Sequence, residues 1–172
     1  MEILSFRIRR GTSCDGLGTD VSNMKITAKS RYALRILLDI AVAGEKGPRP
    51  IKEIALSQGI SEKFISRIAV PLRRAGLLAT ERGAKGGLRL ARFSSKITLL
   101  DIVEATGGPL ALVRCLARPG ICRRQGRCAA ELAWGEVNDA LAAALRRKTL
   151  ASVLADQRRL APPPPSEPDY CI

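Results

Sequence analysis

Apolar residues recur with the spacing of an α-helix in two stretches of the chain. After Ser30 and again after Ser61 they stand at positions i, i+3, i+4 and i+7, which is one face of a helix. The residues are Ala33, Ile36, Leu37 and Ile40 in the first stretch and Ile65, Ile68, Ala69 and Leu72 in the second. The pattern predicts two amphipathic helices that turn these faces toward the core.

A short helix is expected between these two. Gly44 ends the first helix, and Pro50 suits the first position of a second helix that Gly59 ends. Ala55, Gly59 and Ile65 have the spacing of a helix-turn-helix, in which a small residue, a turn glycine and an aliphatic residue let two helices pack closely. Such a pair presents its second helix to the major groove of DNA, although an ordinary helical hairpin would have the same pattern.

The third helix has an exposed face as informative as its buried one. Ser61 is placed as its N-cap. Pro71 lacks the amide that would bond to the carbonyl of Arg67, so we expect a kink there, with residues 61–69 contacting DNA and 72–76 leading the chain away. The residues that must point outward are Glu62, Lys63, Ser66, Arg67 and Val70.

Two strand-like runs follow, LLATE and GLRLA, separated by a glycine-rich turn. They predict a hairpin with a cationic tip at residues 82–87, where Arg82 and Lys85 can reach phosphates or a minor groove. After a helix-turn-helix, such a hairpin is typical of the wing of a winged helix. A short capped helix is expected next, over residues 98–105.

Charge and composition favour a nucleic-acid-binding protein and exclude several enzyme classes. The chain of 172 residues has 29 Lys and Arg against 16 Asp and Glu, a net charge of +13. Residues 24–92 alone hold fifteen basic and five acidic residues, so the positive charge is concentrated where the helix-turn-helix is expected. Histidine is absent from the sequence, which removes Ser-His-Asp chemistry and all imidazole metal ligands. No apolar run is long enough to span a membrane.

Three cysteines lie in a segment broken by glycine and proline. Cys115, Cys122 and Cys128 are spaced C-x6-C-x5-C, and five arginines with no acidic residue lie within residues 114–127. The arginines would stabilise thiolates. A DNA-binding protein is expected in a reducing compartment, which disfavours a structural disulfide. Zinc would need a fourth thiolate or an imidazole as a ligand. An iron–sulfur cluster and redox-active thiols both fit, and inert thiols are the alternative.

A long helix follows the cysteines, and its apolar positions form one strip. A partner for this strip is not evident within so short a chain, so we expect a two-fold dimer interface. A short return helix, TLASVLA, follows. Residues 1–23 and 158–172 are expected to be disordered, and we hypothesise that translation begins at Met24. The strip consists of Ala130, Trp134, Val137, Leu141, Ala144 and Leu145.

The order of these segments resembles the IscR/NsrR/RirA family of winged-helix regulators, also called the Rrf2 family. The likeness covers residues 24–157 and includes MKITAKSRYALRILLDIA, RGAKGGLRLA, ITLLDIVEATGG and LAWGEVNDAL. It implies a homodimer that places the recognition helix in the major groove and the wing tip in the minor groove. It also implies that Cys115, Cys122 and Cys128 ligate an iron–sulfur cluster whose state controls DNA affinity, although the first cysteine spacing is one residue longer than usual.

Three positions depart from the family pattern. IscR-like members have a histidine ligand where this chain has Glu131, whose carboxylate could reach the same iron or could be an ordinary exposed residue of a first helical turn. Arg31 stands where nitric-oxide-sensing members have a carboxylate ligand, and a guanidinium cannot ligate iron, which favours an IscR-like sensor. Ser66 replaces a base-contacting Glu, so with Lys63 and Arg67 nearby the operator preference should differ.

We therefore expect a mainly α-helical protein: a winged helix-turn-helix over residues 24–108, a cysteine loop over 109–129, and a dimerisation helix with a short return helix over 130–157. Its expected function is that of a cytoplasmic, homodimeric regulator, not an enzyme. It would bind an operator in double-stranded DNA and sense iron–sulfur or redox status through a cluster, 2Fe-2S rather than 4Fe-4S, to control iron–sulfur assembly, iron or sulfur metabolism. A cluster-free member regulated by thiol oxidation or a protein partner is the alternative. The predicted metal ligands are Cys115, Cys122, Cys128 and Glu131, and the predicted DNA contacts are Lys29, Arg31, Ser61, Glu62, Lys63, Phe64, Ser66, Arg67, Arg73, Arg82 and Lys85.

Overall fold

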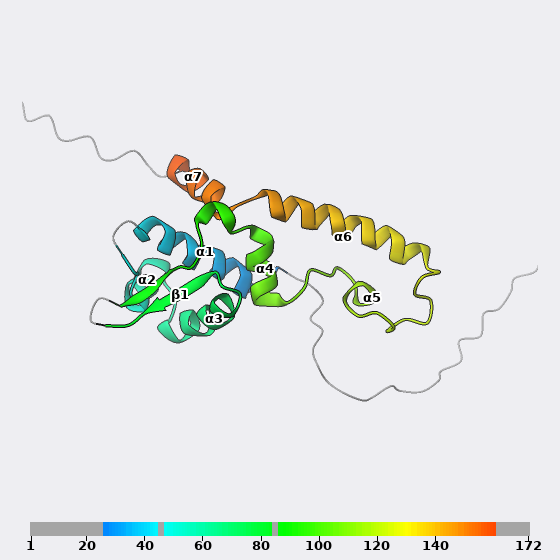
Figure 1. Ribbon diagram of the computed structural model, residues 1–172, viewed down its shortest axis with the longest axis horizontal. Coiled ribbons are helices and arrows are strands. Elements are labelled where there is room, and N and C mark those ends of the chain that lie inside the picture. Colours follow the sequence, from blue (N-terminus) through cyan, green and yellow to red (C-terminus); the bar gives the residue numbers. More distant parts are fainter. Residues whose placement is uncertain (1–25, 45–46, 84–85, 161–172) are drawn as a thin grey trace, which may run out of the picture.

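The computed structural model describes residues 26–44, 47–83 and 86–160. They form a mainly helical fold with one two-stranded antiparallel hairpin, which confirms the predicted fold class (Figure 1). A long helix leads away from the winged-helix body to the cysteine segment. The elements are α1 Ala28–Ala43, α2 Ile51–Gln58, α3 Glu62–Arg74, β1 Leu78–Glu81, β2 Gly87–Leu90, the 3-10 helix η2 Ser94–Lys96, α4 Leu99–Gly107, α5 Arg114–Ala117, α6 Ala129–Arg147 and α7 Leu150–Leu160.

The helix-turn-helix forms from the residues that predict it. Gly59 adopts a φ of +64°, in the left-handed region that glycine tolerates, and its amide donates to the carbonyl of Ala55 at the end of α2. Ser61 caps α3, because its side chain accepts a hydrogen bond from the amide of Phe64. Ile65 is fully buried and holds α3 against the core. The predicted turn and cap are therefore confirmed.

The helix boundaries differ from the predicted ones in small ways. α1 begins at Ala28, two residues earlier than expected, because Thr27 provides the N-cap. Pro50 is the N-cap of α2 rather than its first residue. α3 continues as one helix through Pro71 to Arg74, since the missing proline amide removes only one backbone hydrogen bond near the C-terminal end.

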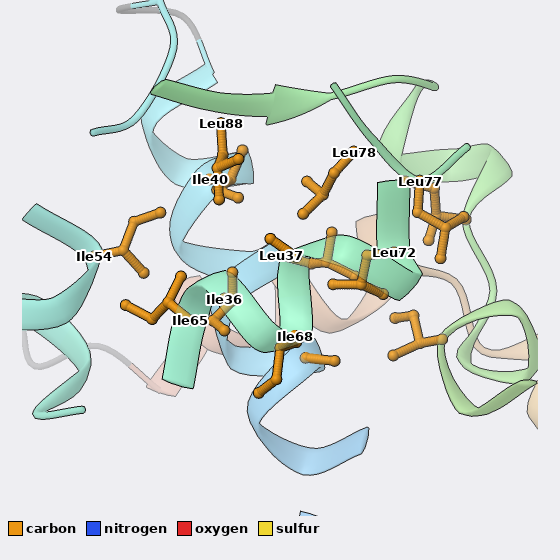
Figure 2. Close-up of a cluster of buried hydrophobic side chains, with 14 of the residues drawn as sticks. Ile36, Leu37, Ile40, Ile54, Ile65, Ile68, Leu72, Leu77, Leu78 and Leu88 are labelled. Carbon is orange, nitrogen blue, oxygen red and sulfur yellow. The ribbon is translucent and has the colours of Figure 1, made fainter. Parts of the chain in front are cut away.

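A single apolar core positions α3. Fifteen buried residues form one cluster, contributed by α1, α2, α3, the hairpin, α4 and their connections, and Figure 2 shows the aliphatic side chains of α1 and α3 meeting inside it. Each large side chain buried in this way stabilises the fold by about 1.5–3 kcal/mol. Leu150, at the start of α7, is fully buried in the same cluster. The return helix, which the sequence analysis grouped with the dimerisation helix, thus packs on the winged helix beside α1.

The hairpin is held against the helices by the loop before α2. Its strands pair from Leu78 opposite Leu90 to Glu81 opposite Gly87. The backbone of Arg49 exchanges two hydrogen bonds of 2.8 Å with that of Leu88. A Cβ atom on Gly87 would lie 2.4 Å from the carbonyl oxygen of Arg49, so glycine permits this close approach. The wing therefore has a defined place beside the helix-turn-helix.

The strip on α6 has a partner within the chain along part of its length. Leu141 and Leu145 lie against a second, smaller apolar cluster, and Ala142, which is outside the predicted strip, is buried in it. The expectation that the strip lacks an internal partner is therefore wrong for its C-terminal half, because the small side chain of Ala142 lets α6 approach α4. Trp134 and Val137 in the other half are 47% and 51% exposed. The second cluster consists of Leu100, Val103, Leu110 and Ala142.

Two connections tie α6 to the winged helix. The amide of Leu99 donates to the carbonyl of Lys148 at 2.9 Å, and the amide of Leu150 donates to the carbonyl of Ile97 at 2.8 Å. These bonds flank the start of α4, where Thr98 and Asp101 form a full capping box. In the part of the chain that the structure describes, no helix is both long enough and apolar enough to cross a membrane.

Candidate nucleic-acid interface and cysteine segment

The exposed side of α3 is basic and directly opposes its buried side. Ser61 and the predicted outward residues are all exposed, whereas Phe64 is half-buried. The ring of Phe64 meets that of Tyr32 edge to face, with centroids 5.3 Å apart, so part of Phe64 serves packing, and its DNA contact stays a prediction. The exposed residues of this helix, which we call the α3 face, are Glu62, Lys63, Ser66, Arg67, Val70, Arg73 and Arg74.

Two details change the expected chemistry of the α3 face. The Ser66 hydroxyl donates to the carbonyl of Glu62 at 2.9 Å, so its proton is used within the helix. Arg74 is exposed next to Arg73, although the sequence analysis did not select it. Its position one helical turn after Val70 was available from the same periodicity.

The start of α1 and the wing supply further exposed cations. Lys29 and Arg31 are exposed in the first turns of α1, which is pinned to α4 by a 2.8 Å hydrogen bond between the hydroxyls of Ser30 and Thr106. Arg82 is exposed at the end of the hairpin. Lys85, the other predicted wing contact, lies outside the described residues.

Arg89 is an exposed wing cation that sequence reasoning missed. It forms an ion pair with Glu81 on the neighbouring strand. The period of two in the strand GLRLA, which turns Leu88 inward, was the signal that placed Arg89 outward.

A buried carboxylate braces the helix-turn-helix from behind. The side chain of Asp39 on α1 is only 6% exposed. It accepts hydrogen bonds from Ser57, from Gln58 Nε2 at 2.8 Å and from Arg49 Nε at 2.9 Å. Burial by itself raises the pKa of Asp39, but these hydrogen bonds outweigh it and hold the pKa below the ordinary value. The backbone of Arg49 also pairs with strand β2 of the wing. The carboxylate of Asp39 therefore links α1 to α2 directly and to the wing through Arg49.

The cysteines lie at the far end of α6 from the winged helix (Figure 1). Cys115 is half-buried in α5, an element that the sequence analysis did not predict, Cys122 is exposed, and Cys128 is the half-buried N-cap of α6. Cys115 and Cys122 line one open hollow of about 510 Å³ together with Val113 and Ile121.

The predicted metal ligands are not gathered around one point. Within the described ranges, no group of three or more Cys, Asp or Glu side chains is close enough to hold a metal ion. The carboxylate of Glu131 accepts a hydrogen bond from the amide of Gly126 at 2.9 Å, which anchors the end of the loop to α6. The donor chemistry, three thiols among exposed arginines, suits an iron–sulfur cluster, whereas the spacing of the donors in this structure does not.

Two kinds of comparison identify the family. A family model described as "Rrf2: Iron-dependent Transcriptional regulator" matches residues 26–156. The chain is 39% identical over 133 residues to protein Rrf2 of Nitratidesulfovibrio vulgaris, covering 77% of this chain and 89% of that protein. It is 31% identical over 137 residues to the HTH-type transcriptional regulator IscR of Escherichia coli, covering 80% of this chain and 84% of that protein.

Solved structures agree with the sequence relatives. CymR (YrzC), the global cysteine regulator of B. subtilis, superposes with a TM-score of 0.65 at 31% identity, over 77% of this chain and 98% of that one. IscR of T. potens has a TM-score of 0.65 at 28% identity, over 82% and 93%. The predicted winged-helix class and the prediction of a regulator rather than an enzyme are therefore confirmed. The chain belongs to the Rrf2 family of transcriptional regulators.

Proposed function

We propose that the protein binds an operator in double-stranded DNA as a homodimer, with the α3 face in the major groove and the wing at an adjacent minor groove. The observation that carries this is the α3 face: a rigid helix, fixed by the core, that exposes four cations beside a basic wing. Such a surface combines phosphate attraction with side chains able to contact base edges. The exposed cations at the start of α1 would extend the contact along the DNA backbone.

The DNA-contact proposal is tested by comparing two kinds of cation. A bidentate Arg contact to guanine contributes about 1–3 kcal/mol of discrimination, so Arg67→Ala should weaken operator binding and leave random-sequence binding largely unchanged. Lys29→Ala or Arg73→Ala should weaken binding to every sequence and lower the salt slope by about one. Fluorescence anisotropy on a selected operator and on a scrambled duplex measures both. Equal losses on the two duplexes for Arg67→Ala would refute the proposed base contact.

The proposed dimer contact is the exposed half of the α6 strip. Trp134 and Val137 leave about half of their surfaces uncovered in the N-terminal half of α6, beyond the part of the strip that packs on the second apolar cluster. A two-fold pairing of α6 helices would bury both. Val137→Arg should convert the dimer to a monomer in sedimentation velocity. Leu132→Arg is the matched control, because Leu132 is 72% exposed on another side of the same helix. Dissociation by both variants, or by neither, would refute this interface.

We further propose that the cysteine segment is the sensing element and binds an iron–sulfur cluster through Cys115, Cys122 and Cys128. The family description as iron-dependent and the likeness to IscR support this, as do the thiols and arginines of the loop. The segment would have to close, because the thiols stand apart. When bound, the cluster would supply a redox- and iron-sensitive link between loop segments. Glu131, which already bonds to the loop, is the proposed fourth ligand, and a 2Fe-2S cluster is proposed over 4Fe-4S.

The signal would reach the DNA-binding face along α6. Loop residues contact the start of this helix, and the far half of α6 packs on α4, which is hydrogen-bonded to α1. A coupling free energy of about 1–3 kcal/mol would change operator affinity 5- to 150-fold. Anaerobic purification with iron and sulfide assays tests for the cluster, and operator binding by loaded and cluster-free protein tests the coupling. Cys122→Ser should abolish the visible absorbance of the cluster. Cys171→Ser is the control, because Cys171 lies outside the cysteine segment in the sequence and its replacement should keep the absorbance.

A second candidate is cluster-free regulation through the thiols or through a protein partner. The separation of the three thiols and the structural likeness to a cysteine regulator favour it. It predicts a colourless protein after anaerobic purification, and operator binding that responds to a thiol oxidant only when Cys122 is intact. A coloured protein with stoichiometric iron and sulfide would exclude it.

Under either mechanism, we propose that the protein acts in the cytoplasm and regulates genes of iron–sulfur assembly, iron or sulfur metabolism.

A further inference from the structure

Val70 is an apolar residue in the middle of an otherwise polar and charged surface. It is 44% exposed, although the other aliphatic residues of α3 are buried in the core. At about 100° per residue, Val70 falls between Ser66 and Arg67 around the helix axis, and Arg74 follows it one turn later. A β-branched residue at this position adds nothing to the core and lowers helix propensity slightly. Its place on the α3 face points to a contact outside the chain.

The surroundings of Val70 restrict what that contact can be. Lys63, Arg67, Arg73 and Arg74 surround it, so the partner of this surface is anionic. A valine side chain can neither donate nor accept a hydrogen bond, and it gains nothing from a phosphate. In the major groove, the base edges present hydrogen-bonding groups together with one apolar group, the 5-methyl of thymine. An apolar side chain on a helix in this groove therefore gains contact energy at thymine.

We propose that Val70 is a specificity-determining residue that recognises a thymine through its 5-methyl group. This inference rests on the proposed DNA-binding function and deepens it. Arg67 would set a preference for guanine by hydrogen bonding, whereas Val70, beside it on the helix, would set a preference for a methylated pyrimidine by van der Waals contact. The α3 face would thus combine one charged and one apolar base contact in each half-site.

The first experiment selects binding sequences from a random duplex pool. The full chain, Val70→Ala and Val42→Ala are compared. Val42 on α1 is the matched control, because it is 56% exposed and lies outside the α3 face. The wild type and Val42→Ala should select the same thymine in each half-site, and Val70→Ala should lose the preference at that position alone. Circular dichroism checks that all three chains are equally helical. Retention of the thymine by Val70→Ala would overturn the proposal.

The second experiment removes or adds only the methyl group. In the selected duplex, the thymine is replaced by deoxyuridine, or by cytosine and 5-methylcytosine in turn. For the wild type, deoxyuridine should weaken binding about three- to fivefold, the change expected from uncovering one methyl group. The 5-methylcytosine duplex should bind more tightly than the cytosine duplex. Val70→Ala should show neither difference.

The outcomes separate this inference from the function on which it rests. If the protein selects no sequence and binds no duplex at low salt, both the DNA-binding function and the thymine contact are refuted. If it selects an operator and Arg67→Ala weakens that binding, but deoxyuridine costs the wild type and Val70→Ala equally, only the thymine contact is refuted.

Discussion

The winged-helix part of this chain and its cysteine part, residues 109–147, differ sharply in how many apolar residues they bury. The winged helix, together with α7, buries fifteen residues in one cluster. Between residues 109 and 147, the described chain buries only Leu110, Ala111 and Ala142. The DNA-binding part thus has the means to hold its shape alone, whereas the cysteine part depends on few contacts within the chain.

The physical origin of this difference is composition. The cysteine segment contains five arginines and three glycine or proline breaks within residues 114–127, and few aliphatic residues remain to be buried. Ile121 in this segment and Trp134 on the following helix α6 are about half exposed. Elements that move in response to a signal come from the less stable end of a protein. A firmly packed winged helix joined to a cysteine segment with few internal contacts is an arrangement that suits a sensor.

The largest expected contrast comes from core truncation. Leu72 is fully buried beneath the α3 face, so Leu72→Ala should lower the free energy of unfolding by about 2–5 kcal/mol. Leu132→Ala, at a 72% exposed position on α6, should change it by less than about 0.5 kcal/mol. Urea unfolding followed by circular dichroism measures both variants. Similar losses would mean that the two parts share one core, and the comparison would fail.

The next largest effect is expected where the wing docks. A Cβ atom on Gly87 would overlap the carbonyl of Arg49, so Gly87→Ala should cost about 2 kcal/mol and displace the wing. Gly44→Ala is the control, because that glycine has a helical φ of −54° and open space around its Cα. Thermal unfolding should separate the two variants. An unchanged melting temperature for Gly87→Ala would show that the wing is loosely attached and belongs with the less packed regions.

The same division explains what could be predicted from the sequence. The i, i+3, i+4, i+7 pattern at Ile65 and Leu72, and the turn at Gly59, are local signals, and the structure reproduces them. Two features depend on contacts distant in sequence: the packing of Ala142 on α4 and the burial of Leu150 in the main core. Periodicity alone identifies an apolar face but not which element covers it.

The candidate site follows the same rule. Exposure of the cations on α3 was predictable because helical spacing determines it. The use of the Ser66 hydroxyl within the helix, and the packing of Phe64 on Tyr32, required atomic positions. The cysteine arrangement could not be predicted from spacing, because the segment lacks periodicity and its conformation depends on few internal contacts.

A smaller effect is expected from the buried carboxylate, and it depends on pH. Because the folded-state pKa of Asp39 is lowered, its contribution is present above the unfolded pKa of about 4 and is lost as the pH falls through the lower folded value. Asp39→Asn keeps the shape but removes the charge, and should cost about 1 kcal/mol at pH 7. The cost should decrease as the pH falls below the unfolded pKa, and it should approach zero only once the pH has passed through the lower folded value. Unfolding measured at pH 7 and pH 3 checks this, and a cost independent of pH would contradict the assigned ionisation.

The smallest effect is expected where the cysteine segment joins α6. The amide of Leu112 donates to Asn138 Oδ1 at 3.2 Å. Asn138→Ala should remove this bond and speed amide exchange at Leu112 about fivefold, a local loss of about 1 kcal/mol, while the unfolding of the main core stays unchanged. Asn138→Asp keeps an acceptor oxygen and should restore slow exchange at Leu112. If Asn138→Ala instead destabilised the main core by as much as Leu72→Ala, the cysteine segment would be part of the rigid body. A signal could then not arise from its independent movement, and the proposed coupling along α6 would need another origin.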